Sequence, residues 1–506
     1  MREVEGDAPD TSARLGALGV ELNALNTIPE SERTQKPSSL FWPWFGANVS
    51  VLAVSYGSYL LGFGVSFWQA TIVGVIGVVF SFLLCGLVAI AGKRGSAPTM
   101  VLSRAAFGYN GNKIASVLSW LLAVGWETVL TSLAVLATAT VFTQLGWDGG
   151  VGTKVLALVV VVLLVLVGGI LGFDFIMKMQ KWITIITGAL TAVYIVLVAG
   201  HIDFDALASL PTGTPQALMG GCVFIMTGFG LGWVISAADF SRYLPRQTPA
   251  RKVVGWTTLG GAIAPAVLLI FGILLAGSSP ELNEAIGMDP IGALATLLPV
   301  WFLVPFTVVA VLGLVGGAVL GIYSSGLALL SAGIPMPRWA AAGLDGIIMT
   351  LGAIYVVFVA TNFIGPFQGF LITLGVPTAA WCGIFLADLM LRKEDYAEAD
   401  LYTPRGRYGS FRVVPAAVLA ISTIVGWGLV TNSFAEWLTW QGFLLEPLGL
   451  GGREGAWAYA NLGVLVALAL GFVGILAFGR PAIRRQEALP LGEPAADRAH
   501  AVGIAR

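Results

Sequence analysis

A tryptophan and a glutamate stand side by side in one apolar stretch of the chain, LLAVGWETVL at residues 121–130. The wide face of Trp126 can stack on a flat, uncharged ring. The carboxylate of Glu127 can accept hydrogen bonds from ring N–H groups, carry a proton, or satisfy backbone groups of a neighbouring helix. Neighbouring residues differ by about 100° around a helix axis, so the two side chains cannot both point squarely at one small ligand.

The composition indicates an all-α integral membrane protein. The chain has 506 residues, of which 57% are hydrophobic and 11% are charged, whereas soluble proteins carry about 25% charged residues. The three cysteines and two histidines show no metal-ligand spacing, and no phosphate-binding loop is present. We therefore expect no metal site, no cofactor and no direct drive by ATP, and the net charge of −1 gives no reason to expect a nucleic-acid partner.

The spans and their orientation follow from hydropathy and charge. Twelve stretches are apolar enough to cross a bilayer as helices. Of the 27 lysines and arginines, only Lys154 and Arg453 fall on one side of this arrangement. Basic residues favour the cytoplasmic side, so we expect a multi-pass protein of the plasma membrane with both termini in the cytoplasm.

Two of the expected spans, 43–66 and 215–240, contain features that weaken a helix. Glycine costs about 1 kcal/mol per residue in a helix interior, and three glycines alternate around Phe229 in the later span. In the earlier span the interruption is expected near its middle, at Ser50, Ser55, Tyr56, Gly57 and Ser58. Unwound backbone in a membrane is tolerated where it lines a cavity, so both segments are candidate binding sites; close helix packing is the alternative explanation.

Five stretches together resemble the nucleobase:cation symporter family of the purine–cytosine permease type. Their order and spacing carry the resemblance over most of the first ten spans. The stretches are VELNALNTIPESERTQKP, WFGAN, GSAPTMVLSRAAFGYNGNK, AADFSRYLPR and YSSGLALLSAGIPMPRW.

The resemblance implies a leucine-transporter-type fold with five-plus-five inverted repeats and two extra C-terminal helices. The expected parts are an N-terminal tail at 1–40, a first repeat at 41–200, a second repeat at 213–392, two further spans at 410–480 and a C-terminal tail at 481–506.

The resemblance also implies roles for individual residues. Trp126 matches the position of the family's ring-stacking tryptophan. Phe229 and Trp233 would close the opposite face of the ring, and the backbone around Gly230 would bond its polar edge. Ser55 and Gly57 are the candidates from the first broken span.

The eighth span departs from the family pattern. Gly317 and Gly321 stand where amide side chains would read the edge of the ring, which argues against cytosine because such sites select by paired hydrogen bonds. Val315 and Gly316 stand where sodium-coupled members place hydroxyls. The sequence therefore favours proton over sodium coupling, with Glu127 as the candidate for the coupling ion.

We expect a secondary transporter, not an enzyme, that imports cytosine, a purine or a similar heterocycle together with H⁺ or Na⁺. The alternative within the same fold is a transporter of allantoin, hydroxymethylpyrimidine or an amino acid. A channel is disfavoured because no ring of charges or repeated filter sequence appears. Asp345 and Asp388 are expected at the inner membrane face, and the sequence makes no prediction of oligomeric state.

Overall fold

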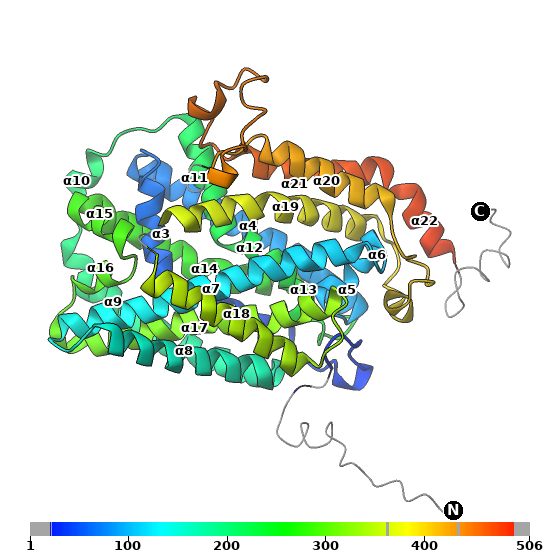
Figure 1. The fold of residues 1–506 in the computed structure, drawn as a ribbon, viewed down its shortest axis with the longest axis horizontal. Helices are drawn as coiled ribbons and strands as arrows, with labels where there is room; N and C mark the ends of the chain where they lie inside the picture. Colours follow the sequence, from blue (N-terminus) through cyan, green and yellow to red (C-terminus); the bar gives the residue numbers. More distant parts are fainter. Residues whose placement is uncertain (1–20, 22, 361–363, 433–435, 490–506) are drawn as a thin grey trace, which may run out of the picture.

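A computed structural model describes residues 21, 23–360, 364–432 and 436–489. The described part is an elongated helical bundle (Figure 1), in which α5, α6, α13 and α22 lie at one end and α10, α15 and α16 lie at the other. We call the first the basic end, because it carries most of the lysines and arginines that connect the spans. The second, which carries Asp203, Asp205, Glu281, Glu284 and Asp289, is called the acidic end.

The helices follow one another along the whole described chain. In the first half they are α2 (Phe41–Asn48), α3 (Leu52–Leu61), α4 (Phe67–Gly95), α5 (Thr99–Leu102), α6 (Arg104–Phe107), α7 (Asn112–Gln144), α8 (Val151–Leu171), α9 (Phe173–Val198) and α10 (Phe204–Ala208). In the second half they are α11 (Pro215–Gly228), α12 (Gly230–Trp233), α13 (Ala237–Ser241), α14 (Ala250–Ser278), α15 (Pro280–Met288), α16 (Gly292–Ala295), α17 (Val300–Ser331), α18 (Arg338–Phe358), α19 (Ile364–Leu391), α20 (Val413–Trp427), α21 (Leu462–Phe478) and α22 (Arg480–Ala488). Short 3-10 turns are η1 (Glu30–Glu32), η2 (Pro37–Leu40), η3 (Ala199–His201), η4 (Val234–Ser236), η5 (Glu398–Tyr402), η6 (Glu436–Leu438) and η7 (Gly452–Glu454).

Long apolar helices account for most of the bundle. Within the described ranges, nine helices are long and apolar enough to cross a membrane, and the bent pair α21–α22 raises the number to ten. The α2–α3 pair and the 15-residue helix α20 are shorter. An all-helical membrane protein is confirmed, and the count of twelve spans stays a prediction that depends on these shorter pieces.

Helices five expected spans apart in the chain pack against each other. The contact between α7 and α17 is among the most extensive in the bundle, and so is the contact between α4 and α14. In a five-plus-five arrangement, α7 and α17 are the third and eighth spans, and α4 and α14 are the second and seventh spans. The packing therefore agrees with two repeats wound around each other, and α21 joins the bundle by packing on α19 and α20.

Of the residues predicted to interrupt the first broken span, Ser50 alone lies in the observed break. The helix stops after Asn48, where Val49 has φ −80° and ψ 70°, and it resumes at Leu52. The expectation that the serines and the glycine at 55–58 interrupt the span is wrong, because all of them lie inside helix α3.

Tertiary contacts explain why these small residues do not break the helix. The Ser55 hydroxyl donates to the Pro290 carbonyl, and the Ser58 hydroxyl donates to Asn283 Oδ1 at 2.6 Å. A Cβ at Gly57 would collide with the backbone of Gly272 in α14. The segment is polar and small because it packs against neighbours, while its own helical hydrogen bonds stay intact.

Candidate functional site

Two helix breaks face each other in the middle of the bundle. The first lies at Val49 between α2 and α3, and the second lies at Phe229 (φ −122°, ψ −115°) between α11 and α12. The Tyr56 hydroxyl of α3 donates to the Gly228 carbonyl at 3.5 Å. A Cβ at Gly228 would come within 2.5 Å of the Tyr56 ring, so glycine allows the two broken spans to approach this closely.

A small cavity of about 40 Å³ lies between the breaks. This volume has room for a few water molecules, since one water needs about 10–15 Å³. A flat ring would need the aromatic walls to part. The walls are made by Ala47, Asn48, Ser50, Leu52, Ala53, Tyr56, Trp126, Leu130, Gly228, Phe229 and Trp233.

Three of the predicted site residues are aromatic and line this cavity. Trp126 comes from α7, and Phe229 and Trp233 come from the break and from α12. Phe229 packs on Tyr56 with ring centroids 4.6 Å apart, and Trp233 meets Trp44 edge to face at 5.7 Å. The arrangement offers broad ring faces with few polar groups, which suits an uncharged aromatic or heterocyclic ligand.

Glu127 lies behind the cavity wall. It is fully buried (0% exposed), and it does not line the cavity. A Cβ at Gly321 of α17 would lie 2.9 Å from Glu127 Cγ and 3.4 Å from its Oε1. The glutamate therefore fills the space that a side chain at position 321 would take. Neither carboxylate oxygen has a hydrogen-bond partner among the described residues.

The nearest charged neighbour of Glu127 is a second carboxylate, on Asp345. Asp345 is 0% exposed and accepts hydrogen bonds from Trp120 Nε1 at 2.7 Å and from the Ser325 hydroxyl at 2.9 Å. The expectation that Asp345 lies near the inner membrane face stays a prediction, but its side chain is buried inside the bundle. Helix α18 begins at Arg338, earlier than the hydropathy indicated, and this places Asp345 two turns inside the bundle.

At the two glycines that stand in place of amides in the eighth span, neighbouring residues already occupy the space that a side chain would take. A Cβ at Gly317 would lie 2.9 Å from the Leu130 side chain and 3.3 Å from the Ala47 carbonyl, so both of its neighbours line the cavity although Gly317 does not. Gly321 faces Glu127, as described above. Leu130 and Glu127 of α7 therefore fill the space beside α17 in which amide side chains were expected.

The remaining predicted residues lie outside the cavity lining. Ser55 and Gly57 pack towards Pro290 and α14. The Gly230 N–H donates to the Ser81 hydroxyl at 3.1 Å, so this backbone donor at the second break already has a partner.

Sequence reasoning singled out Ser50 but did not single out Asn48 and Gln180, which the structure also places at the first break. Asn48 and Ser50 line the cavity, next to Val49. Gln180 reaches from α9 and donates through Nε2 to the Gly316 carbonyl at 2.7 Å. The available signal was a polar residue in an apolar span, the same signal that singled out Glu127.

At the basic end, Glu21 fastens the ends of several helices together. Its carboxylate accepts from Arg242 Nη2 and the Tyr243 hydroxyl, both at 2.7 Å, and from the Phe173 N–H at 2.9 Å. Burial raises the pKa of Glu21, but the guanidiniums of Arg242 and Arg338 with these hydrogen bonds outweigh burial and hold the pKa below its ordinary value. Glu21 is therefore an ionised anchor between the N-terminal segment and the bundle.

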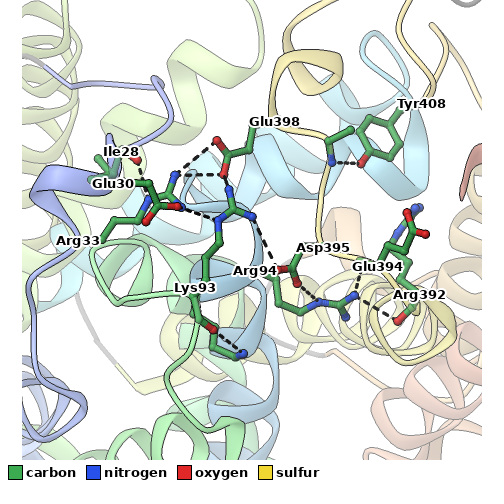
Figure 2. A network of polar contacts seen from close by, with 12 residues as sticks. Ile28, Glu30, Arg33, Lys93, Arg94, Arg392, Glu394, Asp395, Glu398 and Tyr408 are labelled. Atoms are coloured by element: carbon green, nitrogen blue, oxygen red, sulfur yellow. Dashed lines mark hydrogen bonds and ion pairs between the residues drawn. The ribbon is translucent and has the colours of Figure 1, made fainter. Parts of the chain in front are cut away.

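A second network of polar contacts connects chain segments at the basic end (Figure 2). Arg33 bonds Glu30 at 2.7 Å and Glu398 at 3.1 Å, and Arg94 pairs with Asp395 at 3.2 Å. The Glu30 side chain is 65% exposed, and exposed ion pairs contribute only about 0–1 kcal/mol each. This network connects η1, α4 and the segment after α19, but it holds them less firmly than Glu21 does.

Two broken helices around a buried aromatic cavity, in a bundle of apolar spans, define a membrane transporter. The fold matches a solved structure of the nucleobase-cation-symport-1 family transporter Mhp1, closed and with bromovinylhydantoin bound, with a TM-score of 0.66 and 18% identity over 94% of this chain and 98% of that one. A Na⁺-coupled sialic acid symporter matches with a TM-score of 0.58 and 13% identity, over 92% of this chain and 96% of that one. The expected leucine-transporter-type fold is confirmed.

Residues 27–445 match the family described as "Permease for cytosine/purines, uracil, thiamine, allantoin", and the chain belongs to this family. It is similar to the putative purine-cytosine permease YxlA of Bacillus subtilis, with 24% identity over 82% of this chain and 90% of that protein. It is also similar to the purine-cytosine permease FCY2 of Saccharomyces cerevisiae, with 24% identity over 52% of this chain and 48% of that protein. The chain is thus a transporter and not an enzyme, as the sequence predicted.

Proposed function

We propose that this protein is a secondary active transporter that imports a nucleobase or related heterocycle by cation symport. The observation that carries the proposal is the cavity between the two helix breaks, which Trp126, Phe229 and Trp233 line together. Its walls present ring faces and backbone, which suit a flat, uncharged solute. In this proposal the basic end is cytoplasmic, both termini lie on that side of the plasma membrane, and twelve spans cross it.

The proposed coupling ion is the proton. A hard cation such as sodium needs about six oxygen ligands, by analogy with other such ions. Val315 and Gly316 supply no hydroxyl, and the Gly316 carbonyl already accepts from Gln180. Glu127 offers a carboxylate without a hydrogen-bond partner among the described residues, and this supports proton over sodium coupling.

The alternative substrates are allantoin, hydroxymethylpyrimidine or an amino acid in the same fold. Among the described residues that line the cavity, Asn48 is the one amide, and this supports a solute that needs few paired hydrogen bonds at its edge. An amino acid needs free N–H groups at the broken helices to hold its carboxylate. The N–H of Gly230 already donates to Ser81, so the amino acid is the weaker alternative.

Uptake of labelled ring compounds tests the proposal. Cells that lack their own permeases would express the wild type, W126A or W182A, and receive cytosine, adenine, hypoxanthine, uracil, allantoin or hydroxymethylpyrimidine. Base–aromatic stacking contributes about 1–3 kcal/mol, so W126A should raise the half-saturating concentration about 5- to 150-fold. Trp182 is 63% exposed on α9, and W182A is the matched control.

Two outcomes would overturn the proposal. If no compound accumulates above the vector control, the substrate class is wrong. If W126A and W182A behave alike at equal membrane abundance, the cavity is not the site. For the ion, a protonophore should abolish uptake at constant external Na⁺, whereas strict Na⁺ dependence with protonophore resistance would contradict proton coupling.

A further inference from the structure

Three helices bring two carboxylates and one hydroxyl together in the middle of the bundle. Glu127 comes from α7, Ser325 from α17 and Asp345 from α18. The Ser325 hydroxyl lies next to Glu127 and donates to Asp345 Oδ2 at 2.9 Å. The other oxygen of Asp345 is held by Trp120 Nε1 at 2.7 Å. We refer to Glu127, Ser325 and Asp345 as the acid cluster.

No cation balances this cluster among the described residues. Of the other titratable groups on α7, α8, α17 and α18, each is engaged or placed elsewhere. Lys113 lies one residue into α7, beside Gly333. Lys154 lies near the opposite end of the bundle, next to Asp289. Arg338 binds the carbonyls of Gly169 and Ile170, and Tyr323 bonds Arg242.

The last of these groups, Tyr355, is 61% exposed. The other helices that pack on α7 or α17 add Arg104 from α6, Asp174, Lys178, Lys181 and Tyr194 from α9, and Cys382 and Asp388 from α19. Arg104 is buried, but its guanidinium donates to the carbonyls of Leu401 and Ser331. Among the described residues, none of these groups makes a hydrogen bond or ion pair with Glu127 or Asp345.

A buried pair without a cation holds at least one proton. An isolated ionised carboxylate in a low-dielectric interior is so unfavourable that the group takes up a proton instead. Two carboxylates that face each other cannot both ionise, and they release their protons as a coupled pair. The acid cluster therefore has the composition of a proton store, whereas a structural ion pair would contain a cation.

The two acids of the cluster lie at different depths along the long axis of the bundle. At a rise of about 1.5 Å per residue, Glu127 lies about 22 Å from the start of α7 at Asn112. By the same measure Asp345 lies about 10 Å from the start of α18 at Arg338. Both helices start at the basic end (Figure 1), so Asp345 lies between Glu127 and that end.

We propose that Glu127 and Asp345, bridged by Ser325, form the proton site of this transporter. Glu127 takes the coupled proton behind the cavity wall, and Asp345 releases it towards the basic end. In the transfer, the Glu127 carboxyl gives its proton to Ser325 Oγ while the serine O–H gives its own to Asp345. Glu127 becomes the carboxylate, Asp345 becomes the acid, and the serine is restored.

This proposal rests on the proposed symport, but its first test needs no substrate. Infrared difference spectroscopy of the full-length protein in lipid, titrated with pH, reports the C=O stretch of protonated carboxyls. The wild type should show such a band, E127Q should remove its Glu127 component, D345N and S325A should shift what remains, and E127D should restore a band. D289N, which changes a carboxylate at the acidic end, should leave the band unchanged.

The second test separates coupling from substrate movement. E127Q and D345N should retain exchange of labelled for unlabelled substrate but lose protonophore-sensitive accumulation. Spectra that are identical in wild type, E127Q and D345N would overturn the acid cluster, and so would full accumulation by both variants. If the wild type moves none of the ring compounds, the proposed substrate class fails, and the infrared result still decides the proton site.

Discussion

Glu21 and Glu127 are both buried glutamates, yet their surroundings are opposite. Glu21 at the basic end accepts hydrogen bonds from Arg242, Tyr243 and the Phe173 N–H. Glu127 in the middle has no hydrogen-bond partner among the described residues, and its charged neighbour is another acid. A carboxylate surrounded by donors is fixed in one charge state, whereas a carboxylate beside another acid is free to exchange a proton. The comparison separates a structural anchor, Glu21, from the glutamate that we propose as part of the proton site, Glu127.

The largest expected effect is on stability, from breaking the anchor. R242A removes the cation and leaves Glu21 buried without it, which costs about 3–5 kcal/mol for a buried pair. Thermal unfolding of the purified protein should show a strongly lowered melting temperature. R246A is the control, because Arg246 is itself 28% exposed and its partners Glu30, Asp395 and Glu398 are 65%, 47% and 23% exposed, and such solvent-screened pairs contribute only about 0–1 kcal/mol each. Equal losses in both variants would remove the distinction between anchor and surface pair.

The next effect compares the two glutamates directly. E21L should lower the melting temperature because it strands Arg242 without its carboxylate. E127L should leave the melting temperature unchanged or raise it, since replacing an unpaired buried polar group by an apolar one is close to neutral. Proton-driven accumulation should disappear in E127L all the same. A marked destabilisation by E127L would show that Glu127 is a structural acceptor after all.

A pH titration sharpens the comparison at the basic end. Because the pKa of Glu21 lies below its ordinary value of 4.5, its contribution to stability is complete above that value. The contribution is lost as the pH falls through the lower pKa of the folded protein. The melting temperature of the wild type should therefore fall more steeply below pH 4.5 than that of E21Q. Parallel curves would mean that Glu21 does not hold its charge in the folded state.

The smallest effect comes from crowding Glu127. A Cβ at Gly321 would lie 2.9 Å from Glu127 Cγ, so G321A should push the carboxyl aside, at a cost of about 1–3 kcal/mol for overpacking. We expect a shifted pH profile of uptake with little change in abundance. Gly343 of α18 has nothing within 4 Å of its Cβ position, and G343A should leave the profile unchanged.

The sequence predicted the helical bundle and the second break better than the first. Alternating glycines around Phe229 weaken a helix locally, and the structure breaks there. At the first break the local signal is weaker, because it consists of Ser50 beside Val49 and includes no run of glycines. Hydropathy also cannot place a helix start within a few residues, and that uncertainty hid the burial of Asp345.

The sequence also predicted the positions of some site side chains better than those of others. Trp126, Phe229 and Trp233 line the cavity as the resemblance implied, while Glu127 lies behind its wall. Their assignment to substrate binding stays a prediction, as does the assignment of Ser55, Gly57, Gly230, Gly317 and Gly321. Gln180 and Asp345 stand out in the sequence as polar residues in apolar spans, but the residues that they contact are known only when distant helices are brought together.

The position of Glu21 in the chain has a consequence for the balance of charge at the basic end. It precedes the first span. Its carboxylate pairs with Arg242, directly after α13, and is also stabilised by the charge of Arg338 at the start of α18. Without this one negative charge, two positive groups would repel each other across the junction between helices. The N-terminal segment thus supplies the negative charge that balances these two guanidiniums, and a chain shortened past Glu21 would leave both positive charges uncompensated at the junction.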